Sequence, residues 1–260
     1  SHDTFGRVFG LLDPNQFQRC FLDWIKAVCH ITEGQVIAID GKTLRGSYDK
    51  SLGKGAIVMV SAWATANRLV LGQVRVDDKS NEITAIPELL RVLDIAGCIV
   101  TIDAIGCQKE IAADIVDQDA DYIMALKENH GRLYEDVELL FDDLAASHFK
   151  AYPYNYARTI DKNHGRSETR ECWTIADPQV LRLLRGAKEW KKLSTVVKIR
   201  AERCTGSETE VKERYYLSSL TDNAARLLDA KRTHWQIENG LHWVLDVAFR
   251  EDACRIRKDH

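Results

Sequence analysis

Short apolar runs that each end in an acid stand out in the first half of the chain. Val36–Ile39 and Ile99–Ile102 are runs of apolar and β-branched residues, and Asp40 and Asp103 follow them directly. Runs of this length bounded by turn residues are typical of interior strands in a covered sheet. If the two strands are neighbours, the carboxylates lie side by side at one sheet edge, where like charges repel unless a cation or proton separates them.

The same patterns predict the elements around these strands. Further strands are expected at 56–64, 69–76 and 122–126. Helical spacing of apolar residues predicts helices at 14–29, 84–97, 107–116 and 131–146. The resulting order of three strands, helix, strand, helix and strand indicates an α/β fold with a mixed five-stranded sheet flanked by helices.

The pattern changes after residue 148. Stretches rich in β-formers, separated by turns near Gly165 and Gly206, are found at 152–160, 168–175, 193–203 and 210–219. Residues 223–249 return to helical spacing, with Asn223 or Asp222 as the cap. We therefore divide the chain into an N-terminal helical segment (1–35), the first part of a catalytic core (36–148), a β-rich insertion (149–221) and a C-terminal helix that completes the core (222–260).

The composition is that of an ordinary soluble globular protein, with 45% hydrophobic and 29% charged residues among 260. No apolar run approaches the roughly 20 residues of a membrane span and no signal peptide precedes the first element, so we expect a cytoplasmic protein with no membrane partner. The net charge of -3 gives no overall attraction to nucleic acid. Because the sequence starts at Ser1 without a methionine and stops at His260 without a closing element, we expect further residues at both ends of the natural protein.

The seven cysteines form no C-x-x-C pair, and several lie within apolar patterns. An odd number without metal-ligand spacing favours reduced packing residues over disulfides or a thiolate zinc site. We expect free thiols.

A polar stripe near the C-terminus points to a third acid. The residues four apart on one predicted helical face are His234, Glu238, His242 and Asp246. Three interpretations are open: a solvated face, a zinc ion held by the glutamate and the two histidines, or Glu238 as the partner of Asp40 and Asp103. Three carboxylates suit Mg²⁺ or Mn²⁺, and two such ions about 4 Å apart can activate water for phosphoryl displacement.

At these residues the sequence resembles the H-repeat-associated insertion-sequence transposases, members of the DDE group. The segments that carry the resemblance are Ala38–Arg45, Lys79–Pro87, Asp103–Gln108, His164–Arg166, His234–Asn239, Leu241–Trp243 and Leu245–Asp246. The resemblance spans nearly the whole chain and implies an RNase H-like fold with the β-rich insertion before the last catalytic helix. It also implies that Asp40, Asp103 and Glu238 are the catalytic, metal-binding triad for two Mg²⁺ or Mn²⁺ ions.

The reaction that the resemblance implies is metal-dependent hydrolysis of DNA at the ends of the element, then attack of the freed 3′-hydroxyl on target DNA. A homodimer on DNA, associated with the bacterial nucleoid, is expected because two ends must be joined. Basic residues that are candidates for positioning phosphates are Lys42, Arg45, Lys127, His164, Arg166, Arg232 and His234. Related transposases carry a tyrosine, an arginine and a lysine around the third acid, and the corresponding places hold Lys231, His234 and Leu245 here.

Two alternatives keep the same fold. A non-catalytic DNA-binding or regulatory descendant would lose the chemistry, and a metal-dependent nuclease would cut DNA without joining it. Retention of Mg²⁺ or Mn²⁺ binding separates the first alternative from a transposase. A local basic groove can bind DNA even when the net charge is negative, and acidic metal ligands count towards that charge until metal binds.

Overall fold

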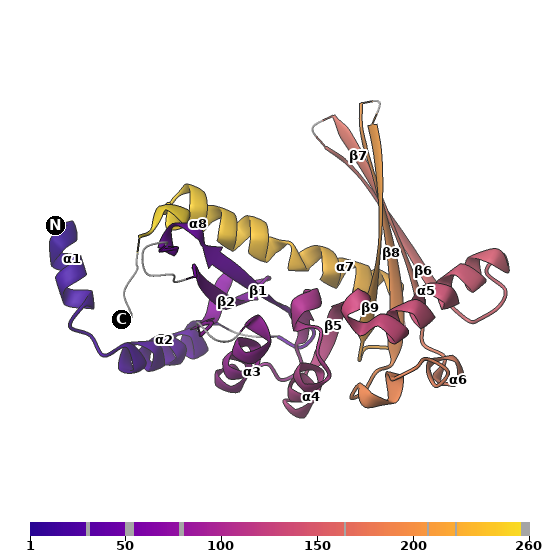
Figure 1. Ribbon diagram of the computed structural model, residues 1–260, viewed down its shortest axis with the longest axis horizontal. Coiled ribbons are helices and arrows are strands. Elements are labelled where there is room, and N and C mark those ends of the chain that lie inside the picture. Colours follow the sequence, from indigo (N-terminus) through magenta and orange to yellow (C-terminus); the bar gives the residue numbers. More distant parts are fainter. Residues whose placement is uncertain are drawn as a thin grey trace.

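The structure is a computed structural model that describes residues 1–29, 32–49, 55–77, 81–163, 165–206, 208–221 and 223–255. Through these residues runs one mixed sheet in which nine strands follow the order β3-β2-β1-β4-β5-β9-β8-β7-β6 (Figure 1). The strands are β1 (Val36–Leu44), β2 (Ile57–Ala64), β3 (Leu69–Arg75), β4 (Ile99–Ile102), β5 (Asp121–Leu126), β6 (Asn155–Asn163), β7 (Arg166–Ile175), β8 (Thr195–Thr205) and β9 (Glu208–Ser218). The strands β1, β4 and β5 are parallel neighbours, while β2 and β3 extend the sheet as an antiparallel meander.

The prediction of a five-stranded sheet is wrong, because the β-rich insertion continues the same sheet. Its strands form two long antiparallel hairpins, β6–β7 and β8–β9, which rise away from the body of the molecule (Figure 1). Strand β9 pairs with β5, from Ile123 opposite Ser218 to Leu126 opposite Tyr215. The strand pattern identifies these elements but carries no information about which distant strand they pair with.

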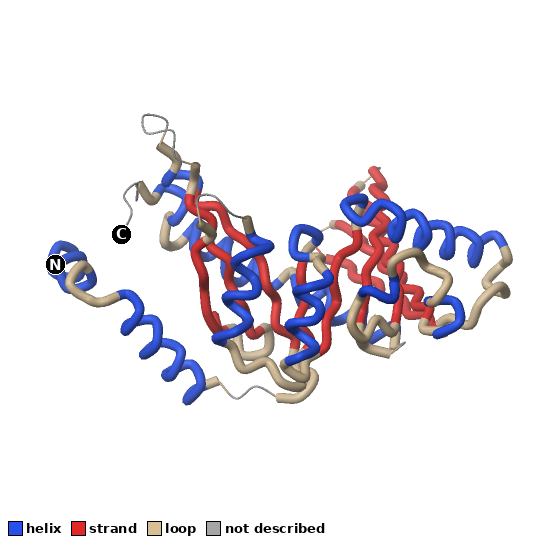
Figure 2. The backbone as a smooth tube through the Cα atoms, turned by 60° about the horizontal axis from the view of Figure 1, so that its bottom comes forward, coloured by secondary structure: helices blue, strands red, loops and turns tan. Residues whose placement is uncertain are grey.

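The helices of the described residues are α1 (His2–Phe9), α2 (Pro14–Val28), α3 (Glu82–Val92), α4 (Lys109–Asp117), α5 (Gly131–Ala146), α6 (Pro178–Leu181), α7 (Ala224–His234) and α8 (Trp243–Val247). Helices of this set cover both faces of the sheet, whereas α1 lies away from it (Figure 1). Ile37 and Ile39 of β1 belong to the larger core, shared with α3, α4 and α5, whereas Ala38 packs on the opposite face against Ile237 and Leu241. Figure 1 shows α7 and α8 on one side of the sheet and α3 and α4 on the other, and Figure 2 shows helices standing in front of the strands.

Two helices differ most from their predicted bounds. The helix α3 begins at Glu82 rather than at Thr84, because the Asn81 side chain accepts a hydrogen bond from a first-turn amide and caps it. It ends at Val92 rather than at residue 97, because the backbone of Leu93 is already extended. The predicted helix over 223–249 begins as expected after its cap but is interrupted, since a π-helical segment, Ile237–His242, separates α7 from α8.

The structure bears on two expectations from the composition. All seven cysteines are free thiols, as predicted. None of the helices in the described part of the chain combines the length and the apolar character needed to cross a membrane.

Candidate active site

The parallel register of β1 and β4 brings the two predicted aspartates together. Ile39 pairs with Ile102, and Asp40 and Asp103 are the next residues along the chain. Because side chains alternate between the faces of a strand, Asp40 lies on the same face as Ala38, towards the segment from α7 to α8. The expectation that the two strands are neighbours is confirmed.

The polar stripe of the C-terminal helical segment faces these strands. Its contacts with charged residues there join His234 Nε2 to Asp103 Oδ1 (3.5 Å), His242 Nδ1 to Asp40 Oδ2 (3.6 Å) and Asp246 Oδ1 to Lys42 Nζ (2.6 Å). Glu238 lies between the two histidines in sequence, close enough to both aspartates for their charges to interact. The interpretation of the stripe as a solvated face therefore does not fit, and acids from three elements gather in one place.

Negative charge accumulates around Asp40. Its pKa is raised from 3.8 to about 7, first by burial and then by the charges of Asp103, Glu238 and Glu82. Burial, followed by the charge of Asp103, also raises the pKa of Glu238. Carboxylates destabilised in this way are stabilised by a cation placed among them.

Two residues of α7 hold Asp103. Lys231 Nζ donates a hydrogen bond of 3.1 Å to Asp103 Oδ1 and lies 5.6 Å from the centre of the Tyr216 ring. Burial would raise the pKa of Asp103, but the Lys231 ammonium brings it below its usual range. Burial, reinforced by Lys231, lowers the pKa of His234 to about 3, so the imidazole is neutral at pH 7.

A fourth acid, Glu82, belongs to the same site and was missed by the sequence analysis. It comes from the first turn of α3, on the other side of the sheet, and lines a cavity of about 200 Å³ together with Asp40, Asp103 and Lys127. A Cβ atom on Gly41 would lie 2.3 Å from the Glu82 Oε1 atom, so glycine leaves the space that this carboxylate fills. One feature of the sequence could have identified Glu82: it lies in Lys79–Pro87, one of the segments that resemble the H-repeat-associated transposases.

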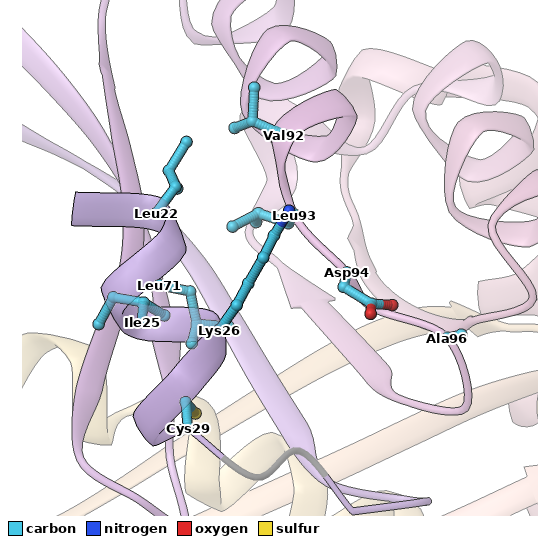
Figure 3. Close-up of a pocket in the computed structure, with 9 residues that line it drawn as sticks. All are labelled: Leu22, Ile25, Lys26, Cys29, Leu71, Val92, Leu93, Asp94 and Ala96. Atoms are coloured by element: carbon cyan, nitrogen blue, oxygen red, sulfur yellow. The ribbon is translucent and has the colours of Figure 1, made fainter. Parts of the chain in front are cut away.

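A larger cavity of about 450 Å³ lies away from these acids, between α2 and the end of α3 (Figure 3). Its lining is mostly apolar, with Leu22, Ile25 and Leu71 on one side and Lys26 and Asp94 as the charged residues among the nine drawn. Its size alone does not make it a catalytic site, because the acids that could perform chemistry gather elsewhere.

Of the predicted phosphate contacts, Lys127 is the one that lines the acidic cavity. The Arg45 side chain is 83% exposed, with Nε 3.7 Å from Asp252. Arg232 bonds to Asp161 of β6 at 2.8 Å, and the exposed Arg166 begins β7 at the far end of a hairpin. His164 lies outside the described residues. None of these three arginines lines the cavity that Asp40, Glu82 and Asp103 share.

Two predicted DNA contacts are corrected by their burial. Lys42 is 7% exposed, and its Nζ lies 2.6 Å from Asp246, 3.3 Å from Glu251 and 3.4 Å from Asp252. His234 is fully buried between Thr101 and Asp103. A paired lysine and a covered imidazole do not reach a phosphate in this arrangement.

The donor set fits Mg²⁺ or Mn²⁺ in its chemistry. The acids supply oxygen ligands, and the raised pKa of Asp40 marks an unbalanced negative charge. In the described part of the chain, however, no three or more His, Cys, Asp or Glu side chains converge as a formed metal centre. The zinc hypothesis has less support, because His234 faces Asp103 and His242 faces Asp40 instead of a common point with Glu238.

The chain is similar to known proteins along nearly its whole length. The family described as "Transposase DDE domain" matches residues 31–260. The chain is 45% identical to "Putative transposase YncI" of Escherichia coli O157:H7 over 98% of its own length, and 45% identical to "H repeat-associated putative transposase YhhI" of Escherichia coli K12 over 99%. It spans 65% and 68% of the length of these two relatives. A match of this extent shows that the chain belongs to the transposase DDE domain family.

Proposed function

We propose that this chain is the catalytic part of a transposase that cleaves DNA phosphodiesters at the ends of an insertion sequence. The freed 3′-hydroxyl then attacks target DNA, which joins the element to a new site. Two copies of the protein act together on DNA in the bacterial cytoplasm, because two ends must be joined. The observation that carries the proposal is the gathering of Asp40, Asp103 and Glu238 from β1, the end of β4 and the C-terminal helical segment.

An RNase H-like core is part of the proposal. The strand order β3-β2-β1-β4-β5, the helices on both faces and the position of the acids on the central strands support it. In this interpretation β6–β9 are the insertion, although they extend the same sheet.

Each residue of the site has a proposed role. The three carboxylates would hold the divalent ions, which, when bound, supply a water of lowered pKa and stabilise charge on the scissile phosphate. Lys127, which lines the cavity beside Asp103, would contact a phosphate oxygen. Strands β1 and β4 provide the rigid support that a site of this kind needs.

The proposal is tested by nicking of a labelled duplex that carries an element end, with Mn²⁺ and the full-length protein. We expect Asp40→Ala, Asp103→Ala and Glu238→Ala each to abolish nicking while the far-ultraviolet circular dichroism stays that of the wild type. The matched control is Asp229→Ala, which removes an exposed acid from the same helical region, on α7, and should leave the rate unchanged.

The products distinguish the alternatives. Strand transfer of the nicked end into a supercoiled plasmid identifies a transposase, and nicking without transfer identifies a nuclease. Tight binding of the duplex without nicking under Mg²⁺ or Mn²⁺ would favour the non-catalytic descendant. Normal nicking by any one of the three triad variants would remove that residue from the assignment.

A further inference from the structure

His234 occupies an unusual position for a titratable side chain. It is fully buried, and its Nδ1 atom lies 2.8 Å from the Thr101 Oγ1 atom. Its Nε2 atom has no hydrogen-bond partner among the described residues, yet lies 3.5 Å from Asp103 Oδ1. A buried imidazole with one satisfied nitrogen and one nitrogen directed at a carboxylate calls for an explanation, because buried polar groups are nearly always paired.

The contacts of Thr101 bear on which nitrogen carries the proton. Its hydroxyl has one hydrogen and two neighbours, the Ile37 carbonyl at 3.5 Å and His234 Nδ1 at 2.8 Å. Either atom can be the donor in the 2.8 Å contact; where the hydroxyl donates to Nδ1, the proton of the neutral ring resides on Nε2 and faces Asp103. The opposite tautomer would direct a lone pair at the Asp103 carboxylate, which is electrostatically unfavourable.

The side chain of Asp103 is held by contacts at one of its two oxygens. Asp103 follows the last residue of β4, and its side chain is 52% exposed. The contacts from α7, by Lys231 and by His234, both reach Oδ1 and leave Oδ2 for another partner. A carboxylate held at one oxygen has the other in a fixed place.

We infer that His234 is a positioning residue for the reaction: its Nε2 atom faces Oδ1 of Asp103 at 3.5 Å and so helps to fix Oδ2 for a divalent ion. The inference rests on the proposed function, in which Asp103 is a ligand. Groups that orient metal ligands through hydrogen bonds typically contribute about 10- to 100-fold to metal affinity.

Two substitutions distinguish the contributions of the Nδ1 and Nε2 atoms of His234. In His234→Asn the amide reaches the place of Nδ1 and keeps the Thr101 contact, whereas in His234→Gln it reaches the place of Nε2 and can donate to Asp103. Mn²⁺ binding to the full-length protein, followed by electron paramagnetic resonance, should weaken about tenfold in His234→Asn and stay close to wild type in His234→Gln. Nicking by His234→Asn should require more Mn²⁺ for half-maximal rate but recover at saturating Mn²⁺.

The controls make each outcome decisive. His130→Asn removes a half-buried histidine that packs on Trp190 and contacts the Cys107 carbonyl, and it should bind Mn²⁺ normally. Wild-type affinity in a folded His234→Asn variant, or an equal loss in His234→Gln, would overturn the inference. Glu238→Gln distinguishes the inference about His234 from the proposed metal site. If Glu238→Gln does not bind Mn²⁺ but His234→Asn binds it normally, the inference about His234 is wrong and the metal site stands. If both variants bind Mn²⁺ like the wild type, the proposed metal site is wrong as well.

Discussion

Gly41 follows Asp40 in β1, and its missing side chain leaves the space for Glu82. A Cβ atom there would lie 2.3 Å from Oε1 and 2.4 Å from Cδ of the glutamate. Such distances are far below van der Waals contact, so any side chain at this position must displace the carboxylate from the site. The glycine therefore has a steric role as well as its place in a strand.

We expect Gly41→Ala to displace the Glu82 carboxylate and to lower the free energy of unfolding by only about 1 kcal/mol or less, because the clashing atoms are the far end of a flexible side chain. The double variant Gly41→Ala/Glu82→Ala should show no such loss, because the clashing carboxylate is gone. Gly55→Ala is the control, since it lies outside the helices and a Cβ atom there meets no described atom within 4 Å. Urea unfolding measures all three, and a loss well above about 1 kcal/mol in Gly41→Ala that the double variant keeps would show that Glu82 is not what the new side chain meets.

The raised pKa of Asp40 predicts how stability depends on pH in the absence of divalent ions. The ordinary pKa of 3.8 applies to the unfolded chain, and the folded value is about 7. Between these values the folded protein keeps a proton that the unfolded chain releases, so stability falls as pH rises from about 4 to about 7 and is level above that. At about 1.4 kcal/mol for each pKa unit, the loss is at most about 4 kcal/mol.

Asp40→Asn should remove this dependence. We expect the wild-type melting temperature to fall more than that of Asp40→Asn between pH 5 and pH 8, and the variant to be the more stable protein at pH 8. Thermal unfolding in a chelating buffer measures both proteins under the same conditions. Parallel curves for the two proteins would contradict the raised pKa.

Single residues show where sequence reasoning ends. Asp40 and Asp103 could be predicted because each ends an apolar run, and a parallel pair of such strands places the acids together. Glu82 could not, because its role depends on an approach to Gly41 across the sheet. The expectation for Lys42 failed for a similar reason: its partners, from Asp246 to Asp252, lie some 200 residues away in the chain.

The interrupted C-terminal helix shows the same limit for an element. Residues four apart in an α-helix advance about 40° beyond a full turn, so a straight α-helix would carry the stripe from His234 to Asp246 gradually off the sheet. The π-helical segment, Ile237–His242, has more residues in each turn and offsets part of this drift. The stripe was predictable from spacing, but the change of helix type that keeps it facing β1 was not.

The strands were the most predictable elements, and their partners the least. Alternation and apolar runs identify β6 to β9 as well as β1 to β5, with bounds close to those observed. The pairing of β9 with β5 depends on residues far apart in the chain, such as Met124 and Leu217. No local pattern contains that information.

Taken as one molecule, the chain should unfold as a unit rather than as a core and an independent insertion. One hydrophobic cluster contains Ile99 of β4, Val197 of β8, Tyr216 of β9 and Leu227 of α7, so the boundary that the sequence suggested passes through a shared core. Differential scanning calorimetry should therefore show a single transition whose calorimetric and van't Hoff enthalpies agree.

Leu217→Ala in β9 tests the connection. The side chain is fully buried, and its truncation should cost about 2 to 5 kcal/mol and lower the one melting temperature without splitting the transition. Val211→Ala, on the same strand but 47% exposed, should have little effect. Two separate transitions in the wild type, or a second transition that appears only in Leu217→Ala, would mean that the insertion is a domain of its own.

The pairing of β9 with β5 has a further consequence for how such proteins diversify. Without β9, the backbone amides and carbonyls along β5 would form an open edge able to recruit strands from other molecules. An insertion at this point can therefore be exchanged or shortened during evolution, or grafted by an engineer, provided that the replacement still supplies a strand to cover β5. A plain loop in its place would favour aggregation even if every acid of the site remained.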